Sequence, residues 1–302
     1  MIAVDKMGGK VLFLNPDTYV TEVTLDSFPR TVHELLVLPE RGLAYVPIYG
    51  DGIHGKNPNP GRVIALIDLK SRKHIGDIDL HPYVSPHTLK LAPDGLIYVT
   101  CENSGVIAAI DPASNTMIDA IGFGSTNGHR LIISQDGQRL YTENEEDADI
   151  SVIDLPNRKL LGKIKTPRAL GGITISADGR TLIAVDDDQP NLFVIDTVKG
   201  EVTRTIALEN VPKPAQIARF REDHKVLAVS SLAASTVTLF DGDLANQTTI
   251  PVGKGAMDMA FRGDDLFVGC QFDGTIHVID VPSRKVRHSF ACGTGVESLG
   301  FF

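Results

Sequence analysis

Short apolar strands separated by polar turns recur along the whole chain at a nearly constant spacing. The clearest marker is a strand that ends in two apolar residues and an acid, and its copies are Leu66-Ile67-Asp68, Ala109-Ile110-Asp111, Val152-Ile153-Asp154, Val194-Ile195-Asp196, Leu239-Phe240-Asp241 and Val278-Ile279-Asp280. A weaker first copy is Phe13-Leu14-Asn15. Successive acids are 43, 43, 42, 45 and 39 residues apart, and 53 residues separate Asn15 from Asp68. A period of about 40 residues indicates seven structural repeats.

Each repeat predicts four antiparallel strands. The first strand runs into a tight turn that carries Asp-Gly, as at Asp94-Gly95, Asp136-Gly137 and Asp178-Gly179. Glycine supplies the positive backbone angles that such a turn requires. A second strand follows, then a loop, the strand that ends in the acid, another turn and a fourth strand. Four strands in about 40 residues are typical of a β-propeller blade.

The two ends of the chain complement one another. Residues 296–302 match the first strand of a repeat, and residues 1–4, 10–14 and 18–25 match its other three strands. Pairing the ends closes the ring and hides strand edges that would otherwise pair with other molecules. We therefore predict an all-β fold, a single seven-bladed β-propeller domain over residues 1–302, with blades at 296–302 plus 1–30, 31–84, 85–126, 127–169, 170–214, 215–255 and 256–295.

Composition narrows the class of protein. The chain has no Trp, so the tryptophan–aspartate class of propeller is not indicated. A net charge of −9 without a Lys/Arg cluster argues against nucleic-acid and anionic-membrane partners. No apolar run is long enough to cross a bilayer, and no charged-then-apolar leader opens the chain. Cys101, Cys270 and Cys292 form no CxxC motif, which favours a reducing, cytoplasmic location. The sequence is also compatible with a leader peptide that has been removed by processing.

The residues that enter the first strand of each repeat form an unusual set. Around the ring, these equivalent positions hold Glu297, His33, His87, His129, Gly171, Gln216 and Met257. Three imidazoles and a carboxylate from four consecutive blades match the ligand set of a divalent metal, with Zn, Mn, Fe or Ni as candidates. We predict a metal site at His33, His87, His129 and Glu297, with Gln216 as the alternative fourth ligand. The structural alternative is that these histidines cap the preceding loops by hydrogen bonds.

Candidate catalytic groups surround this ring. An insertion of about ten residues at 49–61 is placed to fold over the site, and within it His54 and Tyr49 are candidate general bases. Arg130, next to His129, is a candidate for binding an anionic group. The ends of the second strands reach the same face and lead into a second ring of residues: Lys6, Tyr49, Glu102, Glu145, Asp187, Leu232 and Gln271. From this ring Glu145 is the further candidate base. An ordinary surface loop and solvated acids are the alternatives.

The repeats resemble a known family, most clearly in the stretch Ser85-Pro86-His87-Thr88-Leu89-Lys90-Leu91-Ala92-Pro93-Asp94-Gly95-Leu96-Ile97-Tyr98-Val99-Thr100. This stretch resembles the YVTN family of seven-bladed propellers, and the likeness covers the whole chain. The resemblance implies a lactonase, a lyase or a non-catalytic binding protein. The histidine ring is also similar in kind to that of oligogalacturonate lyase, in which three histidines and a glutamine hold a metal, and to the metal-dependent streptogramin lyase.

These observations favour a metal-dependent enzyme, a lactonase or a lyase, that acts on a small oxygenated substrate. The substrate would carry a carboxylate or a lactone, and the reaction would be lactone ring opening or β-elimination. A non-catalytic propeller that binds a protein or peptide on this face is one alternative, because a fold does not imply a function. A metal-dependent isomerase or oxygenase that uses the same site is another.

Overall fold

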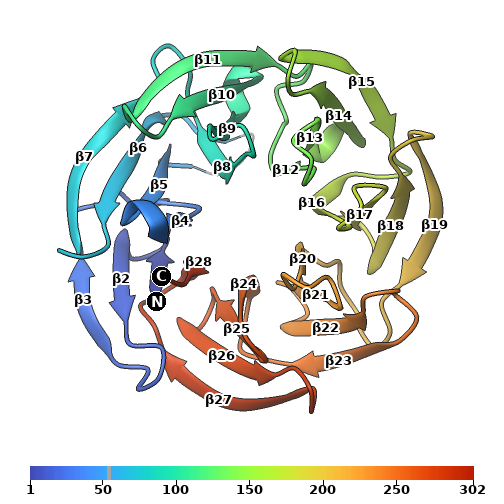
Figure 1. Cartoon of the computed structure of the whole chain (residues 1–302). Helices are drawn as coiled ribbons and strands as arrows, with labels where there is room; N and C mark the ends of the chain where they lie inside the picture. Colours follow the sequence, from blue (N-terminus) through green and yellow to red (C-terminus); the bar gives the residue numbers. More distant parts are fainter. Residues whose placement is uncertain (53–55) are drawn as a thin grey trace.

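Seven four-stranded antiparallel sheets form a ring in the computed structural model of the chain, which describes residues 1–52 and 56–302 (Figure 1). The predicted all-β, seven-bladed β-propeller is therefore confirmed. The first sheet has the order β28-β1-β2-β3, and β28 pairs with β1 from Ile2 opposite Gly300 to Asp5 opposite Val296. The two ends of the chain lie side by side in Figure 1. The C-terminal strand closes the ring, as the sequence predicts.

In each sheet the first strand faces the central channel and the fourth lies at the rim (Figure 1). The strands, sheet by sheet, are β28 (Val296–Gly300), β1 (Ile2–Asp5), β2 (Lys10–Leu14), β3 (Thr21–Leu25); β4 (Leu36–Leu38), β5 (Leu43–Gly50), β6 (Pro60–Asp68), β7 (Lys73–Asp79); β8 (Pro86–Leu91), β9 (Ile97–Cys101), β10 (Val106–Asp111), β11 (Thr116–Gly122); β12 (Leu131–Ile133), β13 (Arg139–Glu143), β14 (Asp149–Asp154), β15 (Lys159–Lys165); β16 (Leu170–Ile175), β17 (Thr181–Asp186), β18 (Asn191–Asp196), β19 (Glu201–Ala207); β20 (Ile217–Phe220), β21 (Val226–Ser231), β22 (Thr236–Asp241), β23 (Gln247–Pro251); β24 (Ala256–Arg262), β25 (Asp265–Cys270), β26 (Thr275–Asp280) and β27 (Lys285–Ala291).

The helical structure of residues 1–52 and 56–302 consists of three single turns: η1 (Pro39–Arg41), η2 (Glu102–Ser104) and η3 (Glu145–Asp147). Among the described residues, no helix has the length and apolar character required to cross a membrane. The turn η2 begins directly after β9 and η3 begins one residue after β13, and the first residue of each is a glutamate. These glutamates therefore lie beside the strand entries at the channel.

The acid that marks each repeat closes the turn between the third and fourth strands. Its carboxylate accepts a backbone N–H from the turn in five copies: Asp68 from Ser71, Asp111 from Ala113, Asp154 from Asn157, Asp196 from Val198 and Asp280 from Ser283. Aspartate is favoured in turns for this hydrogen bond. The regular spacing of the acids in the sequence therefore reflects one turn in each blade.

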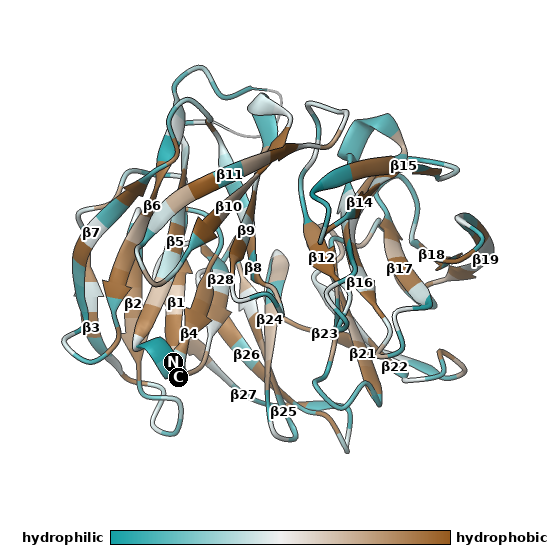
Figure 2. Ribbon diagram, turned by 45° about the horizontal axis from the view of Figure 1, so that its top comes forward, coloured by the Kyte–Doolittle hydropathy of each residue, from teal (hydrophilic) through white to brown (hydrophobic). Residues whose placement is uncertain are grey.

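Apolar side chains fill the spaces between neighbouring blades. One cluster joins Tyr45 and Leu66 of the second blade to Leu89 and Val99 of the third. Figure 2 shows hydrophobic colour along the inner and middle strands and hydrophilic colour in most turns. Because the core lies between the blades, the side chains that face the channel are free to be polar.

The closing strand contributes to this core, and its contribution can be measured. Leu299 of β28 is only 3% exposed and packs in a cluster with Met1, Ala260 and Phe267. Replacing it with alanine leaves a cavity, so Leu299→Ala should lower the free energy of unfolding by about 2–5 kcal/mol. Urea unfolding followed by circular dichroism measures this change. As a control, Val198→Ala at an 81% exposed position should change it by less than about 0.5 kcal/mol. Equal effects would contradict a closing role for β28.

Candidate functional site

The predicted site residues line one cavity of about 170 Å³ at the entrance to the central channel. The predicted residues in its wall are Tyr49, His33, His87, His129, Arg130, Glu145, Gln216 and Glu297. Lys6, Glu102, Leu232, Met257 and Gln271 complete the lining. His54, the remaining candidate, lies outside the described residues. One accessible cavity thus collects ionisable groups from positions spread over most of the chain.

The three histidines occupy equivalent places in consecutive blades. The backbone N–H of His33 donates to the carbonyl of Pro47 at 3.3 Å, and that of His129 donates to the carbonyl of Glu143 at 3.0 Å. Both histidines are therefore held against the second strand of their own blade, and His87 lies at the start of β8. The imidazole centroids are 4.3 Å apart for His33 and His87, and 4.2 Å apart for His87 and His129. The repeat thus places three imidazoles side by side.

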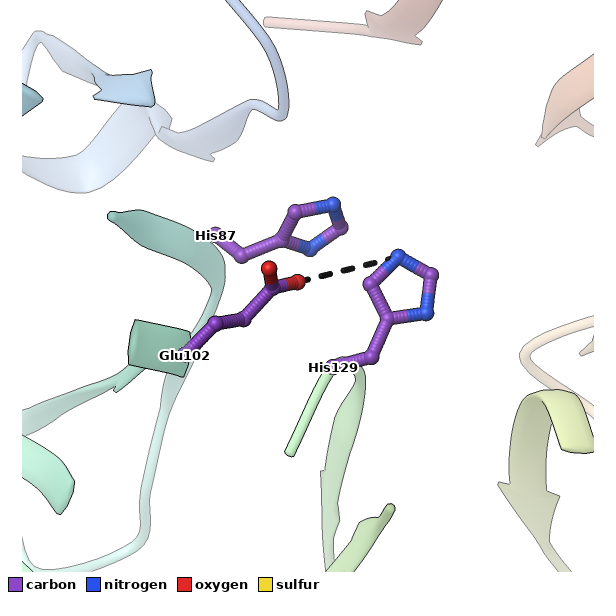
Figure 3. A group of neighbouring side chains, drawn as sticks. All are labelled: His87, Glu102 and His129. Carbon is purple, nitrogen blue, oxygen red and sulfur yellow. Dashed lines mark ion pairs between the residues drawn. The ribbon is translucent and has the colours of Figure 1, made fainter. Parts of the chain in front are cut away.

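Glu102 joins two of these imidazoles in a group that is able to hold a metal. One donor atom each from His87, Glu102 and His129 lies within 4.8 Å of the other two. Figure 3 shows the Glu102 carboxylate directed towards the space between the two rings, with the ion pair to His129 dashed. Oε1 of Glu102 lies 4.0 Å from Nε2 of His129. All three side chains are buried. We call these residues the triad.

Glu143 and Tyr49 contribute to the orientation of the triad. Oε1 of Glu143 lies 2.9 Å from Nδ1 of His129, which leaves Nε2 directed towards Glu102. The hydroxyl of Tyr49 donates to Oε2 of Glu102 at 2.5 Å. A carboxylate behind a histidine fixes its tautomer and increases its basicity, an arrangement that is usual at metal-binding histidines.

The triad fits a transition-metal ion. Ligand distances of about 2.0–2.2 Å place neighbouring donor atoms of a tetrahedral site about 3.4 Å apart. The donor atoms of the triad lie within 4.8 Å of one another, so they would have to move closer by up to about 1.4 Å. Burial lowers the pKa of His87 well below its usual value, so its imidazole is neutral and offers a lone pair. Burial and Arg130 also act to lower the pKa of His129, but Glu145 and Glu143 outweigh them and raise it to about 9. A metal would therefore have to displace a proton from His129.

His33 and Glu297 belong to a second group, together with Lys6. The Lys6 ammonium lies 3.2 Å from both Nε2 of His33 and Oε1 of Glu297, and the latter two atoms are 3.4 Å apart. The side-chain amide of Gln271 donates to the other oxygen of Glu297. Burial raises the pKa of Glu297 although Lys6 opposes it, and burial and Lys6 lower the pKa of His33 well below its usual value. We call Lys6, His33 and Glu297 the lysine cluster.

The ligand set predicted from the sequence is thus divided between two groups. His87 and His129 are in the triad, whereas His33 and Glu297 are in the lysine cluster. Their assignment as metal ligands stays a prediction. Glu102 completes the triad, although the sequence analysis placed it near the site without giving it a role.

Arg130 and Glu145 are both engaged with the protein. The Arg130 guanidinium donates to the carbonyl of Gly171 at 2.8 Å and lies 3.4 Å from Oε1 of Glu34. The backbone N–H groups of Arg130 and Glu145 each donate to Glu143 at 2.9 Å. Glu143 therefore anchors the loop that carries His129 and the turn that carries Glu145. The repeat pattern alone did not indicate a role for Glu143. A usable signal was its place at the end of β13, because the antiparallel pairing of β12 with β13 sets that position beside the entry to β12.

The Tyr49 hydroxyl is better suited to donate a hydrogen bond than to act as a general base. Its ring lies against His33, with centroids 5.1 Å apart, and its hydroxyl is bound to Glu102. Burial and the charge of Glu102 raise the pKa of the Tyr49 hydroxyl. A hydroxyl that holds its proton so firmly stabilises the carboxylate of the triad.

Comparison with known proteins supports the fold. No family model matches the chain, and no curated protein matches its sequence. Among solved structures, 1682 chains match, so the fold is widely shared and says little about function. One of them, hydrazine synthase from Kuenenia stuttgartiensis, has a TM-score of 0.73 and 17% sequence identity, and the match covers 88% of each chain. At this identity the likeness shows the fold alone, and the chain is similar to that enzyme as a β-propeller.

Proposed function

We propose that this protein is a metal-dependent enzyme that acts at the channel entrance on a small oxygenated substrate with a carboxylate or lactone group. The observation that carries the proposal is the buried triad of His87, Glu102 and His129, which lines an accessible cavity beside the lysine cluster. A metal bound there would act as a Lewis acid that polarises an oxygen of the substrate. Zn, Mn, Fe and Ni all suit imidazole and carboxylate ligands.

In this proposal Glu297 transfers the proton. Burial raises its pKa, which brings the carboxylate closer to the neutral range in which general bases are efficient. Lys6 and Gln271 hold one carboxylate oxygen each, so the group is oriented rather than free to rotate. Removal of a proton next to a carbonyl leads to β-elimination, and removal of a proton from water leads to lactone opening. An isomerase would use the same base.

Lys6 supplies the positive charge that an anionic substrate requires. Its ammonium lies at the cavity wall, and its side chain is 13% exposed. The backbone around it is fixed, because its N–H donates to Gly295 and its carbonyl accepts from Thr31. A positioned ammonium binds a carboxylate through charge-assisted hydrogen bonds. We therefore assign Lys6 to binding the substrate carboxylate.

A non-catalytic scaffold that binds a protein or peptide is the second candidate. The observation in its favour is a pair of exposed apolar side chains next to the cavity, Phe272 at 62% and Met7 at 53% exposure. Phe272 follows Gln271 in the chain, and Met7 follows Lys6. Aromatic residues and methionine are enriched at protein–protein interfaces relative to the rest of the surface.

Metal content and turnover in one preparation test the proposed function. Protein purified without chelator and without metal-affinity resin should contain about one transition-metal ion per chain. A panel of lactones and uronates should then reveal turnover that disappears on chelation and returns when metal is added back. Turnover that survives complete metal removal would refute the role of the metal. Absence of both metal and turnover, even after reconstitution, would favour the scaffold.

A further inference from the structure

A second, smaller cavity lies further along the channel, beyond the strand entries. Its volume is about 80 Å³, and the inner strands β8, β12, β16, β20 and β24 line it. The charged residues in its wall are Glu34, Lys90, Arg130, Arg219 and Asp258. Arg130 lines this cavity and the cavity at the entrance. The channel therefore contains a second group of charges that the proposed function does not use.

Two of the three cations in this cavity have an acidic partner. The Arg219 guanidinium lies 2.7 Å from Oδ1 of Asp258. The other oxygen of Asp258 accepts hydrogen bonds from the Ser298 hydroxyl at 2.9 Å and the Leu299 N–H at 3.2 Å. Arg130 pairs with Glu34 at 3.4 Å. Both acids in the wall are thus already matched by an arginine.

Lys90 is the third cation, and it lacks such a partner. Within the described part of the chain, its ammonium has neither a hydrogen bond nor an ion pair. Leu89 before it packs in the core between the second and third blades, so the strand alternation turns Thr88 and Lys90 towards the channel. Burial and the charge of Arg219 lower the pKa of Lys90, although the charges of Glu34 and Asp258 oppose this shift without contacting the ammonium. Three cations against two acids leave one positive charge in excess.

We propose that this cavity is a binding site for one small univalent anion, held by Lys90, Arg130 and Arg219. This volume of about 80 Å³ is roughly half that of the cavity at the entrance, so chloride, nitrate or formate fits it better than a sugar acid does. Thr88 and Thr174 also line the cavity, and a threonine hydroxyl is a possible hydrogen-bond donor to an anion. The ligand chemistry is a single negative charge on a small group. That group is either a free anion or the carboxylate end of a larger ligand.

Thermal unfolding of the metal-free protein tests this site independently of the metal centre. Sodium chloride, nitrate and formate are compared with sodium gluconate, whose anion is too large, at constant ionic strength in the presence of chelator. An anion that binds only the folded state raises Tm in a saturable manner, and we expect a rise of a few degrees. Lys90→Met removes the charge at similar length and should abolish the response. Lys159→Met, which removes an exposed charge from β15, should respond like the wild type.

Bromide locates the site directly and does not depend on the stability of a variant. Crystals of the wild-type protein soaked in sodium bromide should show an anomalous peak between Lys90 and Arg219. Competition of chloride with formate would identify a free anion, whereas a response to carboxylates alone would identify the end of a larger ligand. A wild-type response that Lys90→Met retains in full, or bromide bound only at the outer surface, would overturn the proposal.

Discussion

Replacing His87 with alanine is expected to remove the metal and lower turnover at least about 100-fold, while the protein stays folded. Mutation of a residue that hydrogen-bonds to a metal ligand typically costs about 10–100-fold in metal affinity or activity. Removal of the ligand itself should cost at least as much. His87 contributes a donor atom to the triad and lies between the other two imidazoles. The hydrogen bond between Nδ1 of His87 and the Thr88 hydroxyl contributes only about 1 kcal/mol to stability. Elemental analysis, turnover and a thermal melt of the same sample measure the three quantities.

The matched control is His74→Ala. His74 lies on the outer strand β7, and its side chain is 33% exposed. This variant should keep both the metal and the turnover. Unchanged metal occupancy in His87→Ala would contradict the triad as the metal site.

Glu297→Gln is expected to separate catalysis from metal binding. Glutamine keeps the shape of the side chain but does not accept a proton, so turnover should fall by about 10²–10⁴-fold. Metal content should stay near that of the wild type, because Glu297 lies in the lysine cluster rather than in the triad. Elemental analysis and the rate at saturating substrate measure the two effects separately.

The metal content and turnover of Glu297→Gln are best compared with those of Glu102→Gln. It makes the same chemical change within the triad and should lose the metal together with the activity. If Glu297→Gln loses the metal instead, Glu297 is a ligand, and the ligand set inferred from equivalent strand positions is preferred over the triad.

The fold was predictable from the sequence because each of its determinants is local and repeated. The turn acids at Asp68, Asp111 and Asp154 recur in the sequence because each closes the same turn. The meeting of His33, His87 and His129 was also predictable, since equivalent positions of successive blades face a common axis. Periodicity therefore predicted which strand entries converge.

The partners of these histidines could not be predicted in the same way. Glu102 reaches the triad from the residue after β9, and Glu143 reaches His129 from the end of β13. Neither glutamate lies on the strand whose periodicity was read, and each contact depends on side-chain conformation. The separation of His33 from the triad depends on distances of a few ångströms to Lys6. A repeat fixes which residues share a face but not which of them touch.

The closed ring has a consequence for the order in which the site forms during synthesis. Lys6 and Glu297 are 291 residues apart in the chain and meet only when β28 pairs with β1. The ribosome releases the triad residues long before it releases Glu297. A nascent chain is therefore able to present His87, Glu102 and His129 to a metal while it still lacks the carboxylate that we assign to proton transfer. With Glu297 in the proposed role, catalysis would therefore require the pairing of β28 with β1.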